Sequence, residues 1–286
     1  MTRTHAPATF GALAPSAIES AFRRLGAALP TNYWGRRLAS LLLGPAGGRS
    51  NTPRDIPVFG SQNARLHPFD NICEKRVYLT PQLWDPAERA ALSRAISAAP
   101  GSDFYFLDVG ANVGLYALYA RAAAVAAGKS IQIACIEPDP EMRRRLAFNV
   151  AASDAGEDIR VFPYAAARVR ETLKLAVNAQ SRGMTKLSAD GALSVQGAPL
   201  HEVLLLETGF PRLDAMKIDI EGAEFDALDA FFQHAPEQFL PALVILETSH
   251  ADRERSALDR CRQAGYIVKE QTRLNAILAL NVSNTL

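Results

Sequence analysis

The chain has 286 residues, which is long enough for one large α/β domain with an appendage or for two small domains. Its composition, 48% hydrophobic and 21% charged, is that of an ordinary globular protein and excludes a low-complexity chain. The formal net charge of +1 gives no reason to expect nucleic acid as a partner, and no apolar run reaches the roughly 18 residues needed to span a bilayer.

Near the N-terminus, "SAIESAFRRLGAAL" predicts an amphipathic helix with Ile18, Phe22 and Leu25 on one face. Such a face favours packing on the core or on a partner over docking to a membrane surface. A second copy of the chain is one such partner, so this helix offers a way to form a homodimer. No secretory signal is expected, because no continuous apolar stretch precedes a cleavage site.

Residues 44–70 are rich in Gly, Pro, Ser and Asn and have no sustained period. They predict a long irregular connection, which is a candidate wall of the substrate site. The next stretch, "NICEKRVYLT", is expected to add a short strand. It is followed by "DPAERAALSRAISAAP", which predicts a helix with Asp85 as N-cap and Pro86 in its first turn. Residues 1–100 are therefore expected to be a helical extension that caps the substrate side of a main domain at 101–286.

Strands and helices alternate in the rest of the chain. Buried strands are predicted by apolar runs at 104–107, 131–136, 159–163, 215–218 and 243–246, and helices are expected at 112–127, 140–152, 222–233 and 252–264. Between 171 and 211, "ETLKLAVN" predicts a strand and "AQSRGMTKLSADGALSVQG" a loop. The final "GYIVKE" and "LNAILAL" predict two strands without a helix between them. This alternation predicts a mostly parallel sheet that is covered on both faces and has one antiparallel edge strand.

The first of these strands leads into "FLDVGANVG", which has the layout of a nucleotide-binding loop. A dinucleotide fingerprint starting at Gly110 would need glycine where Asn112 and Leu115 stand, and the lack of GK[ST] excludes a P-loop. Asp108 would repel a pyrophosphate, but it would attract the ammonium or sulfonium of S-adenosylmethionine. At ~4 Å that attraction is about 4 kcal/mol before desolvation. The loop from Asp108 to Gly114 therefore favours the methyl donor.

The second strand ends in "IEPDP", which places Glu137 about 20 residues after the glycine loop. An acid at this distance can accept both ribose hydroxyls, in NAD as well as in S-adenosylmethionine. Pro138 is counted with it among the cofactor-binding residues. Tyr164, after the third strand, is expected to border the adenine.

The segments "FLDVGANVG", "IEPDPEMRRRLAFNV", "MKIDIEGAE" and "LVILE" follow one another in the order and spacing of the FkbM-type methyltransferases. The chain resembles that family over roughly residues 70–280. The resemblance implies a seven-stranded Rossmann-like fold, S-adenosylmethionine as donor, and methylation of a hydroxyl oxygen on varied acceptors that include polyketides and sugars. The N-terminal residues are not explained by it, and substrate choice is expected to reside there.

Candidates for the base that removes the acceptor proton lie at the ends of the fourth and fifth strands. "KIDIEGAE" supplies Asp219, which is also counted in the cofactor site, and Glu221, while "LETSH" supplies Glu247 and His250. Two carboxylates at one strand-to-helix turn repel each other unless they have partners or a task, and His250 has the most suitable intrinsic pKa near neutrality. A Mg²⁺ ion held by Asp219, Glu221 and Glu224 is the mechanistic rival, but nothing in the spacing demands a metal.

The sequence thus predicts an S-adenosylmethionine-dependent O-methyltransferase that acts on a hydroxyl of a sugar, a glycan or a secondary metabolite. A NAD-dependent oxidoreductase and a non-catalytic nucleotide-binding protein of the same fold are the alternatives. The three cysteines show no ligand spacing, and Cys135 is expected to be a buried, reduced thiol. A cytoplasmic location fits this cysteine usage best.

Overall fold

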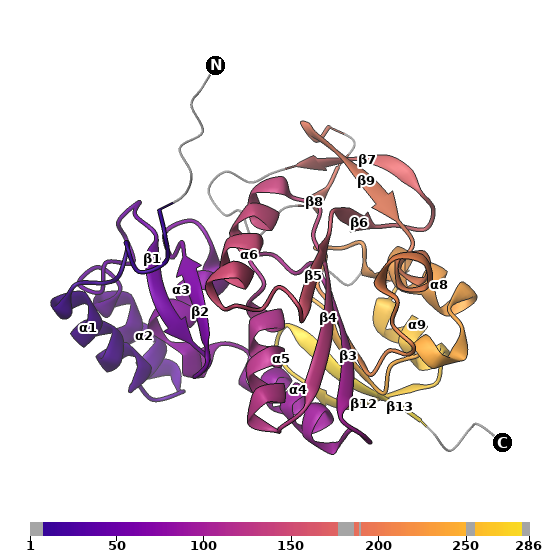
Figure 1. Cartoon of the computed structure of the whole chain (residues 1–286), viewed down its shortest axis with the longest axis horizontal. Helices are drawn as coiled ribbons and strands as arrows, with labels where there is room; N and C mark the ends of the chain where they lie inside the picture. The colour runs from indigo at the N-terminus through magenta and orange to yellow at the C-terminus, as the bar shows by residue number, and fades with distance from the viewer. Residues whose placement is uncertain (1–7, 177–185, 189, 250–254, 282–286) are drawn as a thin grey trace.

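The computed structural model describes residues 8–176, 186–188, 190–249 and 255–281. A seven-stranded sheet in the order β12-β13-β11-β10-β3-β4-β5 forms its centre (Figure 1). The strands are β3 (Asp103–Val109), β4 (Ser130–Ile136), β5 (Ile159–Phe162), β10 (Ala215–Ile218), β11 (Leu243–Glu247), β12 (Tyr266–Gln271) and β13 (Asn275–Leu280). The predicted fold class is confirmed. The antiparallel strand, β13, lies one position inside the edge, between β11 and β12.

Helices cover both faces of this sheet because its parallel strands are apolar on both sides. One face packs against α4 (Pro86–Ala98), α5 (Leu115–Ala126) and α6 (Pro140–Ala152). The other face packs against α7 (Leu200–Val203), α8 (Glu224–His234) and α9 (Ala257–Gln263). A π-helix (Leu204–Thr208) continues α7, and short 3₁₀ turns occur at Pro81–Leu83 and Glu237–Phe239. Cys135 is fully buried and free, as expected.

The expected irregular connection at 44–70 is wrong, because it contains a β-hairpin. Strands β1 (Arg54–Val58) and β2 (Gln62–Leu66) pair antiparallel around a turn at Phe59 and Gly60, both of which have positive φ. The apolar side chains of the hairpin are buried in the same cluster as those of α4 and α5. The N-terminal part and the sheet therefore share one continuous hydrophobic core.

The expected strand at 71–80 is also wrong, because these residues form helix α3 (Ile72–Leu79). The Asn71 side chain accepts hydrogen bonds from the backbone N–H groups of Cys73 and Glu74 at 3.0 and 3.2 Å and so caps the helix. Glu74 is completely buried, where it bonds the backbone N–H of His67 and forms an ion pair with Arg145. An Asn followed three residues later by Glu is a helix-start signal that could have predicted α3.

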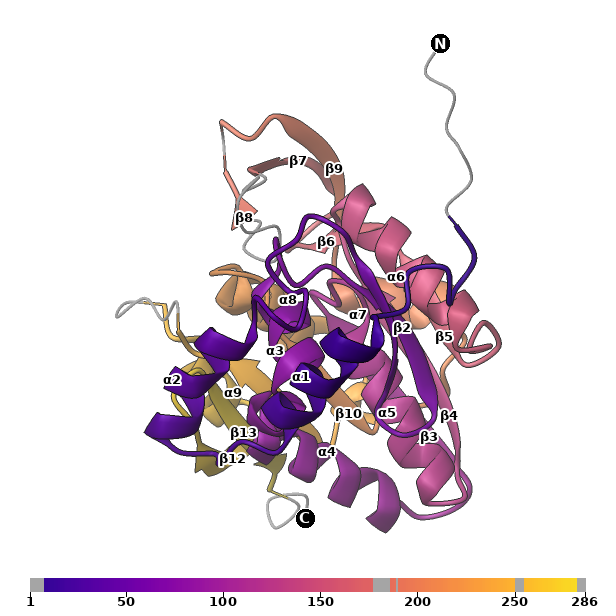
Figure 2. The same cartoon turned by 90° about the vertical axis from the view of Figure 1, so that its left-hand side faces the viewer.

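Two further helices, α1 (Ala17–Ala27) and α2 (Tyr33–Leu42), lie side by side on the outside of the N-terminal part (Figure 2). Ser16 and Glu19 form a capping box at the start of α1, and Gly26 of α1 packs closely on Leu79 of α3. Of the predicted apolar face of α1, Phe22 packs on the core while Ile18 and Leu25 stay exposed. Within the described residues, no helix is long and apolar enough to cross a membrane.

A second, four-stranded sheet lies beyond the central one, at the top of Figure 1. Its order is β6-β9-β7-β8, formed by β6 (Tyr164–Ala166), β7 (Glu171–Ala176), β8 (Lys186–Leu187) and β9 (Leu193–Ala198). The expectation of a loop throughout 179–197 is therefore wrong for β8 and β9. The start of this sheet forms part of the wall of the site described next.

Candidate active site

The glycine loop bends sharply after β3 to leave room for the end of a neighbouring strand. Gly110 has φ +76°, and a β-carbon added to it would lie 1.9 Å from the Asp219 carbonyl oxygen. Its N–H donates to the Ile136 carbonyl at 2.9 Å. The ends of β3, β4 and β10 therefore meet around this glycine, which no larger residue can replace without moving them.

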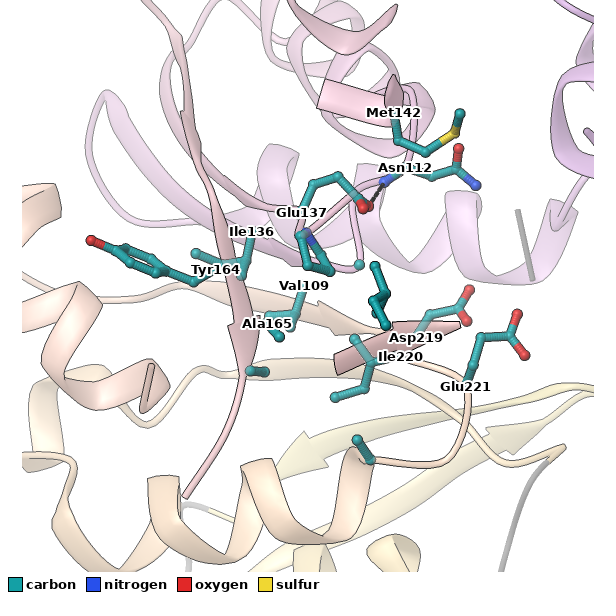
Figure 3. A pocket seen from close by; sticks show the side chains of 15 residues that line it. Val109, Asn112, Ile136, Glu137, Met142, Tyr164, Ala165, Asp219, Ile220 and Glu221 are labelled. Atoms are coloured by element: carbon teal, nitrogen blue, oxygen red, sulfur yellow. Dashed lines mark hydrogen bonds between the residues drawn. The ribbon is translucent and has the colours of Figure 1, made fainter. Parts of the chain in front are cut away.

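A cavity of about 600 Å³, measured out to its open mouth, lies beyond the carboxyl ends of these strands. Six residues predicted to bind the cofactor line it: Gly110, Asn112, Glu137, Pro138, Tyr164 and Asp219. The sequence analysis did not single out Met142, Ala165, Leu175 or Ile220, which supply apolar wall. Figure 3 shows Tyr164 at one end of the cavity and the carboxylates of Asp219 and Glu221 at the other. The size falls in the range of small-molecule sites.

The Glu137 carboxylate is held in place by two backbone N–H groups, those of Asn112 at 2.7 Å and Asp139 at 2.8 Å. Burial raises the pKa of Glu137 to about 7, although these hydrogen bonds act in the opposite direction. Each carboxylate oxygen has a second lone pair, so the group can still accept bonds from a ligand. Asp139 caps α6 by accepting from the N–H of Glu141 at 2.8 Å.

Lys217 lies close to two carboxylates beneath the other end of the cavity, those of Asp219 and Asp108. It is 5% exposed, donates to Asp219 Oδ2 at 3.0 Å, and pairs in register with Asp108 on the adjacent strand. Burial lowers the pKa of Lys217, but the charges of Asp219 and Asp108 outweigh burial and raise it. Lys217 is therefore a buried cation, which favours the ionised form of Asp219.

Asp108 does not belong to the lining of the cavity. It is 1% exposed, and no side chain among the described residues forms a hydrogen bond with its carboxylate. Burial raises its pKa to about 6, against the opposing effect of Lys217. Gly114 also lies outside the lining, where it begins α5 with φ +82° and packs against Leu146. Asp108 and Gly114 thus lie behind the glycine loop, on its side away from the cavity.

Glu221 and Glu247 bring further negative charge to the Asp219 end. Glu221 lines the cavity and adopts φ +56°, a conformation that costs a non-glycine residue free energy and often marks a functional site. Burial, the charge of Asp219 and a hydrogen bond with Asp219 raise the pKa of Glu247 well above its ordinary range. Glu247 therefore holds a proton more readily than an exposed glutamate does. His250, the fourth base candidate, lies outside the described residues.

Glu224, a ligand in the alternative metal mechanism, uses its carboxylate in hydrogen bonds to the backbone. Its carboxylate accepts hydrogen bonds from the backbone N–H groups of Ile220 at 2.8 Å and Gly222 at 3.0 Å, so it closes the turn before α8. Across the described part of the chain, no group of three His, Cys, Asp or Glu side chains is arranged to hold a metal ion.

Asn112 adopts φ +53° and links the loop to the N-terminal part. Its side-chain oxygen accepts a hydrogen bond of 3.0 Å from Asn71, the residue that caps α3. The sequence analysis missed Asn71 because its partner is far away along the chain. The helix-start signal at Asn71 would have placed a helix there, but would not have indicated contact with the loop.

A Rossmann-like sheet with an acid-lined cavity beyond β3, β4 and β10 defines a protein that binds a nucleotide-like ligand. The profile described as "Methyltransferase FkbM domain" matches residues 108–279, more than half of the chain. The chain therefore belongs to the FkbM methyltransferase family. No curated protein sequence matches it.

Several solved structures of methyltransferases are similar to this chain at low sequence identity. The FkbM methyltransferase of Methylobacillus flagellatus KT is 18% identical, with 74% of this chain and 55% of that chain covered and a TM-score of 0.43. Precorrin-6y C5,15-methyltransferase from Geobacter metallireducens GS-15 is 14% identical, with 66% and 84% covered and a TM-score of 0.40. M. capricolum TrmK, solved in complex with S-adenosyl-homocysteine, is 9% identical, with 66% and 65% covered and a TM-score of 0.38.

Proposed function

We propose that this protein is an S-adenosylmethionine-dependent O-methyltransferase acting on a hydroxyl of a carbohydrate or a secondary metabolite. The observation that carries the proposal is that one cavity has Glu137 in its wall and Lys217-paired Asp219 at its far end. The Glu137 carboxylate can accept hydrogen bonds from ribose hydroxyls, and the Asp219 carboxylate can attract the cationic end of the donor, where the acceptor must also lie.

The ends of the cavity match the two ends of such a donor. Tyr164, Ala165 and Pro138 offer apolar surface to an adenine, and Glu137 offers carboxylate oxygens to the ribose hydroxyls. At the opposite end, Asp219 and Glu221 offer negative charge to a sulfonium and an ammonium. Asp108 adds negative charge beneath the loop, with its counter-ion Lys217 beside it.

When bound, S-adenosylmethionine supplies an electrophilic methyl group. Glu137, Asp219 and Glu221 would hold the donor so that this methyl group could pass to the acceptor oxygen, with the bonding electron pair left on sulfur. Asp219, which is 36% exposed and held by Lys217, takes the hydroxyl proton and then releases it to solvent. A positioned base of this kind accelerates a reaction by about 10²–10⁴-fold.

Residues 1–100 form the proposed substrate-side cap. Support comes from α3, since its capping residue Asn71 bonds to Asn112 of the glycine loop.

Burial and the charge of Asp219 both raise the pKa of Cys73, to about 12, so this thiol next to the site stays protonated and is unsuited to nucleophilic chemistry.

Calorimetry with S-adenosylhomocysteine and with NAD tests the donor. Binding of S-adenosylhomocysteine alone is expected, and stabilisation by NAD alone would contradict the proposal. Release of S-adenosylhomocysteine over a panel of sugar and polyketide hydroxyls then tests the reaction. Binding without transfer to any acceptor would favour a non-catalytic binding protein.

Asp219→Asn tests the base. The variant should lose about 10²–10⁴-fold in kcat at saturating donor, where weaker binding of the donor to a site without the Asp219 charge does not affect the rate. Asp259→Asn, at an exposed position on α9, is the matched control and should leave kcat unchanged. Full activity of Asp219→Asn would remove this residue from the mechanism.

A further inference from the structure

Helices α1 and α2 expose an unusual concentration of large apolar side chains. Six of the twelve exposed large apolar residues in the described chain lie within these two helices: Ile18, Leu25, Tyr33, Trp34, Leu38 and Leu41. We call this set the N-terminal apolar surface. Such a concentration is typical of a part of the surface that is covered by a partner.

The spacing of these residues makes a stripe on each helix. On α2, Trp34, Leu38 and Leu41 recur at intervals of four and three residues and so share one face. On α1, Ile18 and Leu25 are seven residues apart and also share a face. Trp34 and Ile18 are 66% and 70% exposed, so neither serves the core of the described structure.

Positive charge lies at this surface, where Arg37 donates to the Tyr33 hydroxyl at 2.6 Å and its guanidinium lies over the Tyr33 ring. Residues 8–53 contain five arginines and a single acidic residue, Glu19, which is already paired with Arg54 at 2.6 Å. Four of the arginines are exposed and have no carboxylate within ion-pair distance in the described residues: Arg24, Arg36, Arg37 and Arg49. The chain as a whole is almost neutral, so its basic excess is concentrated in this part.

We propose that the N-terminal apolar surface docks on an anionic lipid bilayer. Exposed Trp, Tyr and Leu beside arginines on a short amphipathic helix pair are the composition that inserts shallowly between headgroups. The unpaired guanidinium groups match a negatively charged surface, whereas a two-fold contact between copies of this face would bring like charges together. This inference does not depend on the proposed methyl transfer.

The docked face is coupled to the site through α3. Arg23 of α1 donates to the Tyr78 carbonyl at 3.1 Å and lies over the Tyr78 ring. At the other end of α3, Asn71 bonds to Asn112 of the glycine loop. Docking would therefore orient the cavity relative to the bilayer, as suits an acceptor that is presented at a lipid surface.

Flotation of the full-length protein with vesicles tests this proposal. We expect binding to phosphatidylcholine vesicles that contain about a third phosphatidylglycerol, at least tenfold weaker binding to pure phosphatidylcholine, and release in about 1 M salt. The double variants Arg36→Glu/Arg37→Glu and Trp34→Ser/Leu38→Ser should each weaken binding tenfold or more. Arg94→Glu and Val125→Ser, at exposed positions on α4 and α5, are the matched controls.

Three results would overturn the proposal. The first is that the parent protein binds neither kind of vesicle. The second is that the control variants lose as much vesicle binding as the double variants do. The third comes from sedimentation velocity without lipid. If the parent chain is a dimer and the variant Trp34→Ser/Leu38→Ser is a monomer, this face is a contact between copies of the chain. Circular dichroism spectra that match the parent protein show that the variants are folded.

Discussion

Glu137 combines two properties that a ribose-binding carboxylate needs. Backbone N–H groups of Asn112 and Asp139 fix its orientation, so little side-chain entropy is lost when a ligand binds. Burial raises its pKa to about 7. The fraction of molecules in which Glu137 is ionised therefore increases as the pH passes through neutrality, and the carboxylate is a stronger hydrogen-bond acceptor than the neutral acid.

Glu137→Gln should weaken binding of S-adenosylhomocysteine by about 10–100-fold, because the amide has one acceptor oxygen where the carboxylate has two. In the parent protein, affinity should rise between pH 6 and pH 8, and the variant should lack this rise. Titration calorimetry across this range measures both effects. Exposed Glu157→Gln is the control, and parental affinity in Glu137→Gln would show that the ribose lies elsewhere.

Individual site residues were predictable from the sequence when their position followed from strand ends. Glu137 and Asp219 come directly after apolar strands, and parallel strands bring their carboxyl ends to one edge. Asp108 instead lies within β3, one residue before its end, and so its side chain is buried in the sheet beside Lys217 rather than in the lining of the cavity. Asn71 could not be placed at the site, because its contact with Asn112 depends on tertiary packing.

Among the elements, the β1–β2 hairpin is fastened by a buried ion pair. Arg65 donates to both carboxylate oxygens of Asp55 at 2.7 and 2.9 Å and lies over the Phe148 ring at 4.0 Å. Asp55 also accepts from the backbone N–H groups of Gly11 and Leu13. One carboxylate thereby ties the hairpin to the chain segment before α1.

Asp55→Ala should lower the free energy of unfolding by about 3–5 kcal/mol, because it leaves the Arg65 guanidinium buried without its counter-ion. Replacing both residues, as Asp55→Ala/Arg65→Met, should cost less than the sum of the two single changes. Urea unfolding measures these differences. Arg262→Ala, in an exposed pair with Asp259, is the control and should change stability by less than about 1 kcal/mol. Additive costs would mean that Asp55 and Arg65 do not interact.

The elements of the central sheet were predictable and those of the N-terminal part were not. Runs such as 131–136 and 215–218 are mostly apolar, with Gln132 and Lys217 as the polar members, which is typical of a strand buried on both faces. In β1, Ile56 and Val58 alternate with Asp55 and Pro57, a pattern too short and too close to Pro and Gly to stand out. The burial of Asp55 depends on Arg65, a tertiary contact that no local pattern encodes.

At the scale of the whole molecule, four carboxyl groups with raised pKa values make stability depend on pH. Asp85, Asp108, Glu137 and Glu247 are protonated more readily in the folded than in the unfolded chain, chiefly because they are buried. Between their unfolded and folded pKa values the folded state binds more protons, so the free energy of unfolding falls as the pH rises. For Asp108 the fall extends from about pH 4 to about pH 6.

Asp108→Asn should therefore stabilise the ligand-free protein above pH 6 by on the order of 1–3 kcal/mol, and the gain should vanish below about pH 4. Urea unfolding at a series of pH values measures it. Asp190→Asn, at an exposed position, should show no such pH dependence. A variant that is less stable than the parent at pH 8 would mean that the attraction between Asp108 and Lys217 outweighs burial.

The close approach of Gly110 to the Asp219 carbonyl has a consequence for how ligands bind. The glycine loop and the backbone of Asp219, whose carboxylate lies at the acceptor end, are so close that a β-carbon on Gly110 would lie 1.9 Å from the Asp219 carbonyl oxygen. Occupancy at one end should then alter affinity at the other, and thermodynamic reciprocity makes the factor the same in both directions. The two substrates of the proposed reaction would thus bind cooperatively, with Gly110 as the point of mechanical contact between their sites.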